Sequence, residues 1–525
     1  MKFKGYLRSL HEHMNPPVWY GSAALIIAFV LYGTMATEQA RQSFALIHQW
    51  IVLHFGWFFI LTAAGCLFFV LFLMMGPYGS IRLGDENSRP EFSNFAWFTM
   101  VFAAGMGTGL VYFGVVEPLR HTLHPPPKTF VEGGTDLNGL MYSFFHWGLH
   151  PWAIYVLVGL SLSYFHFRRG LPLAPRSMLY PLLGRRIYGP AGHITDILCT
   201  VGTLFGVATS LGFGAQQINA GFSQLTDIAF GTRTQVLLIV IITAFATTSV
   251  LLGLHSGISV LSRINIVLAV FLLAFVFFFG PTLSIIENAV SATGFYLQHL
   301  LETSFFIRPG QNSQWQMDYT LFYWSWWISW SPFVGVFTAR ISRGRTIRQY
   351  IAGVLLVPTL AVILWMSVFG VSGLEAYRGG MEQLSSVVQD QPALALHSLL
   401  SGYPLPTIMS ILATLLITIF FITSSDSGSL VDDMVTSGGN PDPPRTLRLF
   451  WALAEGAVAI TLLIAGGLSA LRSASLSSGL PMAVLLVLAG FALYRGLKED
   501  RNPRNPGKYG SRPRDGMQES ERPSV

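Results

Sequence analysis

The chain contains the stretch Tyr323-Trp324-Ser325-Trp326-Trp327-Ile328-Ser329-Trp330-Ser331-Pro332-Phe333, in which four tryptophans fall within seven residues and no residue is charged. At helical spacing, Tyr323, Trp326, Trp327 and Trp330 stand at i, i+3, i+4 and i+7 and share one face. Aromatic faces carry negative quadrupole charge, so they attract a cation without an acidic partner. A quaternary ammonium suits such a face best. The alternative is an interfacial aromatic belt, which the clustering well inside an apolar span disfavours.

Composition places this stretch in a membrane protein. Of 525 residues, 52% are hydrophobic and only 11% charged, against roughly 25% charged in a soluble domain. About twelve apolar segments are long enough to cross a bilayer as helices, which predicts an all-α polytopic fold. We place these segments near residues 18–36, 51–75, 95–115, 140–164, 194–226, 234–254, 258–284, 319–339, 350–373, 405–430, 448–470 and 479–496.

Basic residues predict the orientation. The formal net charge of +6 sits largely in short loops, which the positive-inside rule explains better than nucleic-acid binding. Segments 165–193 and 340–349 are rich in arginine and lack acids. With an even number of spans, both termini are expected in the cytoplasm, and we expect no cleavable signal. We therefore predict a cytoplasmic tail over 1–17, a transmembrane domain over 18–496 and a disordered cytoplasmic tail over 497–525.

The stretch Gly105-Met106-Gly107-Thr108-Gly109 interrupts the third apolar segment. Glycines at alternating positions weaken a helix and expose backbone groups. In a membrane such backbone is tolerated where it lines a cavity or where helices pack closely. A lysine-dependent phosphate loop is excluded because no lysine follows. The stretch predicts a broken helix beside a site, with tight packing as the alternative.

The fourth segment carries Trp147 and Tyr155, which are eight residues apart and fall near one helical face. His146 and His150 stand at i and i+4, the spacing of a metal pair. Structural histidines are the better interpretation, because no third ligand follows at a suitable spacing. Pro332 in the eighth segment should free the carbonyl of Ile328.

The tenth segment ends in Phe420-Phe421-Ile422-Thr423-Ser424-Ser425-Asp426-Ser427-Gly428. Hydroxyls beside a carboxylate in apolar surroundings offer oxygen ligands for a hard cation such as sodium. They serve equally well as hydrogen bonds between helices, and both interpretations stay open here. Asp426 is costly to bury and should have a partner. Cys66 and Cys199 are expected to be small core residues.

Together these segments closely resemble the betaine/carnitine/choline transporter family. The resemblance is carried by the tryptophan stretch running on to Ser342-Arg343-Gly344-Arg345, the glycine stretch with Glu117-Pro118, residues 145–155, and residues 421–428 with Thr436-Ser437-Gly438-Gly439. It implies a fold similar to the inverted-repeat sodium symporters of the LeuT type, with repeats near 95–284 and 319–496. It also implies a homotrimer in the inner membrane.

The resemblance implies roles for individual residues. The expected substrate box is Trp147, Tyr155, Trp326, Trp327 and Trp330, with the backbone of Gly105, Gly107 and Gly109 for a substrate carboxylate. One sodium site would comprise Ala103, Met106, Phe420, Thr423 and Ser424.

The sequence also departs from the family pattern. A second sodium site would match at Thr203 and Phe333, but its other position is Val207, whose side chain has no oxygen. Gly109 stands where choline carriers driven by protons tend to have an acid, which favours a zwitterion. Arg263 is the residue to check as a fixed positive charge, which replaces sodium in ion-independent members.

We therefore predict a secondary transporter, not an enzyme, that imports glycine betaine with sodium by alternating access. Its expected partners are the quaternary ammonium substrate, sodium and the lipid bilayer, with no other cofactor. The alternatives are a proton-coupled or ion-independent carrier of choline, carnitine or a sulfonium compound. A channel is disfavoured, because the sequence predicts aromatic constrictions where a channel would expose a continuous line of polar groups. A membrane sensor is disfavoured, because the expected C-terminal tail is too short to form a folded signalling domain.

Overall fold

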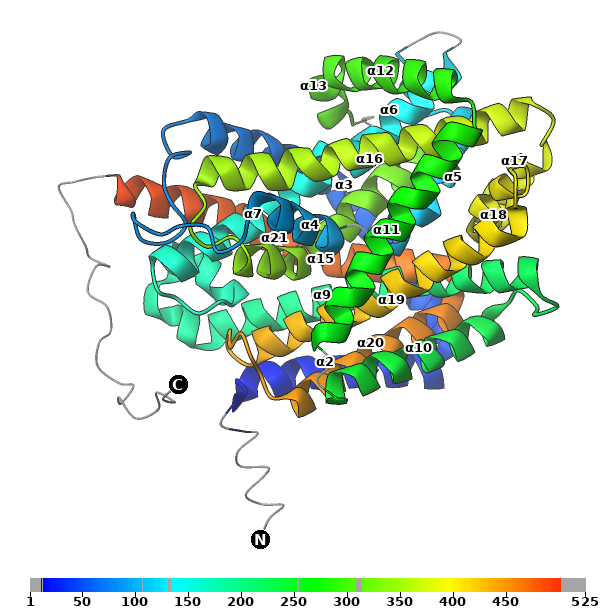
Figure 1. Cartoon of the computed structure of the whole chain (residues 1–525). Coiled ribbons are helices and arrows are strands. Elements are labelled where there is room, and N and C mark those ends of the chain that lie inside the picture. Colours follow the sequence, from blue (N-terminus) through cyan, green and yellow to red (C-terminus); the bar gives the residue numbers. More distant parts are fainter. Residues whose placement is uncertain are drawn as a thin grey trace.

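A computed structural model describes residues 11, 13–105, 107–130, 134–252, 255–307 and 314–501. The described residues form helices joined by loops, with one isolated antiparallel bridge between Arg82 and Thr346 (Figure 1). The principal helices are α2 (Pro16–Met35), α3 (Thr37–Met75), α4 (Asn94–Gly105), α5 (Thr108–Leu123), α6 (Thr135–Trp147), α7 (Leu149–Ser163), α9 (Pro190–Leu225), α10 (Thr232–Leu252), α11 (His255–Phe279), α15 (Phe322–Arg340), α16 (Ile347–Arg378), α19 (Pro406–Thr436), α20 (Arg445–Gly466) and α21 (Leu468–Asp500).

The all-α polytopic class is confirmed. Each predicted apolar segment coincides with one helix or with two consecutive helices. Within the described residues, nine helical stretches are long and apolar enough to cross a membrane. Twelve crossings stay a prediction. The third segment is broken between α4 and α5 at the glycine stretch, and the fourth between α6 and α7 at Gly148.

Local sequence explains where several helices begin. Prolines occupy the first turn of α2, α9 and α19, where a missing backbone N–H costs nothing. The helix α16 begins with a capping box: the Thr346 hydroxyl accepts from the amide of Gln349, whose side chain accepts in return from the amide of Thr346. Gly467 has a φ of 57° between α20 and α21, a conformation that glycine adopts without strain.

Helix pairing is reciprocal between the two halves of the chain. The helix α5 packs on α16, and α15 packs on α7. In the same way α9 packs on α20 and α21, while α19 packs on α10 and α11. The long helices α9 and α19 also pack on each other. This exchange of partners is what two repeats of five helices would produce, although the repeat itself stays a prediction.

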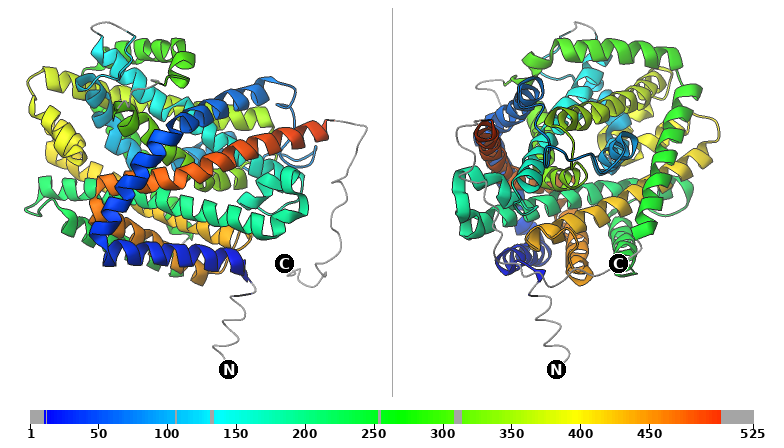
Figure 2. Two further views of the ribbon diagram at one scale, coloured as in Figure 1. Left: turned by 180° about the vertical axis from the view of Figure 1, so that it is seen from behind. Right: turned by 60° about the vertical axis from the view of Figure 1, so that its left-hand side comes forward.

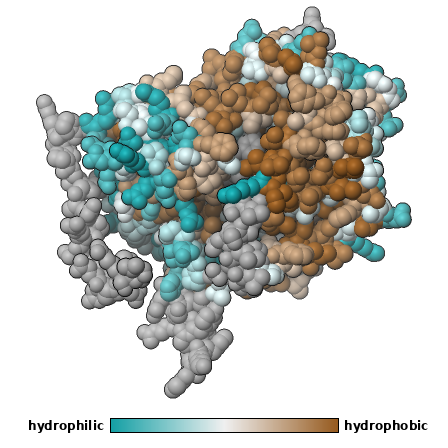
Figure 3. Space-filling model, viewed as in Figure 1, coloured by the Kyte–Doolittle hydropathy of each residue, from teal (hydrophilic) through white to brown (hydrophobic). Residues whose placement is uncertain are grey.

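The arginine-rich segments lie together at one end of the helices. The Arg168 guanidinium donates to the carbonyl of Gly84 over 3.2 Å, and the amide of neighbouring Leu83 donates to the carbonyl of Arg345 over 2.8 Å. Arg168 also pairs with Asp500, at the end of α21. In Figure 3 this hydrophilic end borders a broad hydrophobic surface. The common location of the two arginine-rich segments agrees with the positive-inside pattern.

Two long connections between the principal helices contain helices of their own. The segment between α11 and α15 contains α12 (Thr282–Gln298) and α13 (Leu300–Ser304), and the segment between α16 and α19 contains α17 (Gln383–Asp390) and α18 (Ala395–Leu400). The helix α12 lies across the ends of other helices at the outside of the molecule (Figures 1 and 2). The predicted boundary at residue 497 falls inside α21, which continues to Asp500. Cys66 and Cys199 are free and buried, as expected.

Candidate functional site

The aromatic face of α15 is assembled as its spacing predicts. The rings of Trp326 and Trp327 stack with centroids 4.6 Å apart, and Trp330 stacks at 6.4 Å from Trp326 and 6.3 Å from Trp327. Tyr323 stacks on Trp327 at 6.1 Å. All four side chains are buried, which excludes the interfacial belt as their environment.

Trp147 and Tyr155 form a second wall, from either side of the break at Gly148. Trp147 meets Trp327 edge-on at 4.8 Å, with planes 73° apart. Tyr155 meets Trp330 edge-on at 6.3 Å. The structure therefore brings together the five rings of the expected substrate box, which we call the aromatic box (Trp147, Tyr155, Trp326, Trp327 and Trp330).

Two atoms of the aromatic box have no hydrogen-bond partner among the described residues: the indole nitrogen of Trp330 and the hydroxyl of Tyr155. The other indoles are anchored. Trp327 donates to the carbonyl of His146 over 2.9 Å, and Trp147 donates to the Glu117 carboxylate. Because buried polar atoms are normally paired, the two free groups are available to a bound molecule.

The break between α4 and α5 lies against the aromatic box. A Cβ built on Gly109 would lie 3.0 Å from Cη2 of Trp326 and 3.1 Å from Cη2 of Trp147. A Cβ on Gly107 would lie 4.0 Å from Cη2 of Trp330. A side chain at Gly109 would therefore press on two rings. The first amides of α5 also begin here, where a helix favours negative charge.

Some predicted residues fall where the structure says little. Met106 lies outside the described residues. Ala103 and Gly105 have described backbone near the end of α4, but their side-chain surroundings are not described. The neighbouring start of α5 is held firmly: the Thr108 hydroxyl donates to the carbonyl of Ser210, and the Gln217 amide donates to the carbonyl of Thr108, each over 3.0 Å.

A buried network under the aromatic box was missed by the sequence reasoning. Glu117 Oε1 lies 2.7 Å from His146 Nδ1 and 3.1 Å from His121 Nε2, while its other oxygen accepts from Trp147. The signal available was the spacing of Glu117 and His121 at i and i+4. Nothing local to either residue points to His146, which comes from another helix.

Among the described residues, these three form a group that could hold a metal, since their ligand atoms lie within 4.8 Å of one another. Sequence spacing did not reveal Glu117 and His121 as neighbours of His146, because both lie on α5 and His146 lies on α6. The metal pair of His146 and His150, which the sequence disfavoured, is not among the groups of described residues that could hold a metal, and His150 Nε2 lies 2.9 Å from the hydroxyl of Ser304. Glu117 already hydrogen-bonds to the rings of His121 and His146 and to the indole of Trp147. The geometry is therefore that of a hydrogen-bond network that positions Trp147 in the aromatic box.

The hydroxyl cluster of α19 faces the glycine break. A Cβ on Gly107 would lie 3.5 Å from Ser424 Oγ. Thr423 Oγ1 donates to the carbonyls of Ile419 and Phe420 over 2.9 and 3.2 Å. Thr423 and Ser424 thus stand on a half-buried stretch of helix, and Ser424 lies beside Gly107, which precedes α5. The donor set is the oxygen-only kind that a hard cation requires.

Asp426 has the partner that its burial required. It accepts from Arg448 of α20 over 2.6 Å, and both side chains are buried. The ion pair therefore ties α19 to α20 and gives Asp426 a structural role.

The expected second sodium position lacks a side-chain oxygen at Val207, as the sequence indicated. Thr203 and Phe333 are buried, and so is Val207. Phe333 stacks on Trp330 at 5.5 Å. Val207 instead faces α19, where a Cβ on Gly428 would lie 2.9 Å from Val207 Cγ2. Arg263 is exposed on α11, so its side chain is not a buried charge within the site.

The carbonyl of Ile328 is not free, contrary to expectation. Pro332 removes its usual donor, but the hydroxyl of Ser331 donates to this carbonyl over 2.7 Å. A serine side chain therefore replaces the lost backbone bond, a common repair in membrane helices. The carbonyl of Ile328 is therefore hydrogen-bonded and is not left without a donor.

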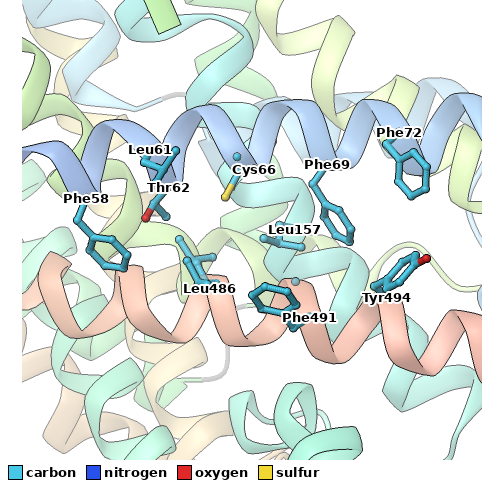
Figure 4. A pocket seen from close by; sticks show the side chains of 13 residues that line it. Phe58, Leu61, Thr62, Cys66, Phe69, Phe72, Leu157, Leu486, Phe491 and Tyr494 are labelled. Atoms are coloured by element: carbon cyan, nitrogen blue, oxygen red, sulfur yellow. The ribbon is translucent and has the colours of Figure 1, made fainter. Parts of the chain in front are cut away.

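A groove of about 530 Å³ lies elsewhere, along the helices α3 and α21 (Figure 4), which pack on each other and cross on the side of the molecule shown at the left of Figure 2. Side chains such as Phe58, Leu61, Phe69 and Phe491 line it. It lacks charged groups that would recognise a zwitterion, so the aromatic box remains the candidate substrate site.

Comparison with known proteins agrees with this geometry. Residues 17–502 match the family described as BCCT, betaine/carnitine/choline family transporter. A glycine betaine transporter of Acinetobacter baylyi is 42% identical over 497 residues, covering 94% of this chain and 74% of that protein. A glycine betaine transporter of Bacillus subtilis is 39% identical, covering 93% of this chain and 96% of that protein. A high-affinity choline transport protein of Escherichia coli is 38% identical, covering 96% and 75%.

Proposed function

The chain belongs to the betaine/carnitine/choline transporter family, and from this premise we propose that it imports glycine betaine together with sodium by alternating access. The observation that supports this best is the aromatic box, with its five buried rings beside a broken helix. Two of the relatives described above are named glycine betaine transporters. The cytoplasmic membrane, with both termini in the cytoplasm, is the proposed location, and a homotrimer the proposed assembly.

The substrate head group would bind among the rings. Each favourable contact of a trimethylammonium with an aromatic face contributes about 1–2 kcal/mol, part of which is offset by the loss of hydration. A substrate carboxylate would reach the amides at the start of α5, because Gly107 and Gly109 lie against Trp330 and Trp326. A zwitterion such as betaine uses both features, whereas choline lacks the carboxylate.

Sodium is the proposed coupling ion, carried as cargo. Ser424, whose hydroxyl lies near Gly107 at the α4–α5 break, and Thr423, one residue earlier on α19, would supply hydroxyl oxygens. Phe420, Ala103 and Met106 complete the proposed set. An ion bridging α19 and the end of α4 would hold the broken helix in place. Ordering that helix first would prepare the amides of α5 for the substrate, which links the two binding events. Thr203 and Phe333 remain a proposed second position, weakened by Val207.

Alternating access would use the reciprocal packing of the two halves. The helices α5 and α15 each border the aromatic box and each pack on a helix from the other half of the chain. Movement of one half against the other would therefore open the aromatic box to one side of the membrane while closing it to the other.

Uptake into proteoliposomes tests the proposal. Labelled betaine, choline, carnitine and dimethylsulfoniopropionate are offered separately under an imposed sodium gradient, an imposed proton gradient or neither. We expect betaine to accumulate only with the sodium gradient. Accumulation of choline under the proton gradient would replace this proposal with a proton-coupled choline carrier. Exchange without any gradient would indicate an ion-independent carrier.

A further inference from the structure

Four carboxyl groups lie buried where α19 packs on α20, which run side by side in Figure 1. Among the described residues, the guanidinium that pairs with one of them is that of Arg448, while the guanidinium of Arg340 from α15 contacts the neighbouring Met434 Sδ at 4.0 Å. Glu455, Asp432 and Asp433 are completely buried, while Asp426 and Arg448 are 5% and 6% exposed. Burying so many unbalanced charges is very costly, so this cluster must be neutralised by more than Arg448.

Arg448 is committed to one of these acids. It donates to both the carboxylate and the carbonyl of Asp426, over 2.6 and 2.7 Å. Both carboxylate oxygens of Asp432, both of Asp433 and Oε1 of Glu455 have no hydrogen-bond partner among the described residues. Asp433 differs from the other two in that Arg448 and the hydroxyl of Ser437 act on it favourably. Asp432 and Glu455 therefore lack the partners that a buried carboxylate requires.

Asp432 and Glu455 belong to one group. Glu455 interacts electrostatically with Asp432, Asp426 and Arg448, and Asp432 interacts with Asp433. From α19, the hydroxyl of Ser425 donates to Glu455 Oε2 over 3.0 Å. From α9, the neighbour is the uncharged Val207.

Glycine allows this close approach of α19 to Glu455. A Cβ built on Gly428 would lie 2.7 Å from Glu455 Oε1 and 2.9 Å from Val207 Cγ2. The free oxygen of Glu455 thus lies beside the residue that makes the second sodium position apolar. Glu455 Oε1, which has no hydrogen-bond partner among the described residues, therefore lies close to Val207, the position at which the second sodium site lacks an oxygen ligand.

We propose that Asp432 and Glu455 form a proton-binding pair that serves as a second ion position of the transporter. A proton neutralises a buried carboxylate without needing the several oxygen ligands that sodium requires. In the arrangement described, the proton is bound to a carboxylate oxygen of the pair and no other bond changes.

The location of the pair suggests how it gains and loses this proton. Asp432 lies four residues before the end of α19, and Glu455 lies ten residues into α20. The pair therefore extends inward from the end of α19 that Asn15 contacts, where the Asn15 amide donates to the carbonyl of Thr436 over 2.7 Å. Separation of α20 from α19 would admit water, stabilise the carboxylates and release the proton. Closure requires the neutral pair, so proton binding favours the closed arrangement.

Infrared spectroscopy of the purified full-length protein in lipid tests the site directly. A neutral carboxylic acid has a carbonyl stretch that a carboxylate lacks. We expect the wild type to show this band at neutral pH, and Asp432→Asn or Glu455→Gln to diminish it. Glu382→Gln, at an exposed acid, is the control and should leave the band unchanged. A spectrum that is identical in wild type, D432N and E455Q overturns the proposal, as does a carboxylate band that shifts with sodium in its place.

Coupling to transport is tested by the pH profile, and this part alone rests on the proposed function. Wild-type uptake of betaine should weaken as pH rises, because closure requires the proton. In E455Q, whose amide mimics the neutral acid, uptake or betaine binding measured by tryptophan fluorescence should no longer change with pH. An unchanged profile in both E455Q and D432N rejects the coupling. If the wild type carries no betaine, the infrared band still decides whether the proton is bound, so the two failures are distinguishable.

Discussion

The indole rings of Trp326 and Trp327 lie almost parallel, with planes 14° apart and centroids 4.6 Å apart. Consecutive residues of a helix normally point about 100° apart, so their rings stack only when both side chains bend toward a common space. Trp147 supports them, since its ring meets both edge-on, at 4.8 and 6.2 Å. Offset and edge-on pairs of this kind stabilise the arrangement. These contacts hold the rings against one another, which lowers the cost of ordering them when a substrate binds.

Trp330→Leu should raise the half-saturation concentration for betaine about 5- to 30-fold, the equivalent of one cation–π contact of about 1–2 kcal/mol. This residue is the cleanest to remove, because its indole nitrogen has no described partner to leave unpaired. The measurement is initial uptake against substrate concentration, at matched membrane abundance.

Trp57→Leu is the matched control, since Trp57 is 53% exposed on α3. It should leave the half-saturation concentration unchanged. Normal uptake by W330L would remove Trp330 from the aromatic box.

Glu117→Ala should abolish or severely reduce transport. It leaves the indole of Trp147 and the rings of His146 and His121 without their acceptor. Each hydrogen bond to a charged group contributes about 1.5–3 kcal/mol, so Trp147 should lose its position. Glu117→Gln keeps one acceptor oxygen and should retain partial activity.

The readout for Glu117 includes the melting temperature and the tryptophan fluorescence change on adding betaine. Glu375→Gln is the control, because the Glu375 side chain is partly exposed and accepts a hydrogen bond from the hydroxyl of Ser284 over 2.9 Å, far from the aromatic box in sequence and outside its network. Equal affinity for betaine in E117A and the wild type would show that the Glu117 network does not position Trp147 in the aromatic box.

Residues close together in the sequence were the ones that could be predicted. The face of Tyr323, Trp326, Trp327 and Trp330 follows from helical spacing, and the helix break follows from the glycines. Contacts across the chain could not be predicted in this way. Nothing near Glu117 specifies that His146 approaches it, because that contact depends on how α5 and α6 pack.

Hydrogen bonds made by individual side chains were the second kind of feature that could not be predicted from the sequence. The proline rule predicted a free carbonyl at Ile328, but a rotatable hydroxyl one residue before Pro332 satisfies it. Which acceptor a hydroxyl reaches depends on the torsion angle of its side chain, and the periodicity of the sequence does not specify that angle. The partner of Asp426 was likewise required by the cost of burial, yet its identity as Arg448 depended on the packing of α19 and α20.

Thr423→Ala should raise the sodium concentration for half-maximal uptake by about tenfold, which corresponds to about 1.4 kcal/mol. The change removes one hydroxyl ligand of the proposed sodium site while keeping the helix. Thr418→Ala is matched, because Thr418 lies on the same helix and donates to the carbonyl of Thr414 over 2.8 Å. Unchanged sodium activation in T423A would exclude this hydroxyl as a ligand.

Gly109→Asp should change which substrate is preferred. A carboxylate here would lie against Trp326 and Trp147, beside the proposed ammonium position, where it attracts a cation and repels a substrate carboxylate. Choline carries only the positive charge, so the ratio of choline to betaine uptake should rise while betaine uptake falls. Gly109→Ala introduces the crowding without the charge and should reduce both substrates together. Competition uptake with both labelled compounds, in the wild type and the two variants, separates these effects. An equal loss of betaine and choline in G109D and G109A would mean that volume alone matters at this position, and that the glycine does not select for the zwitterion.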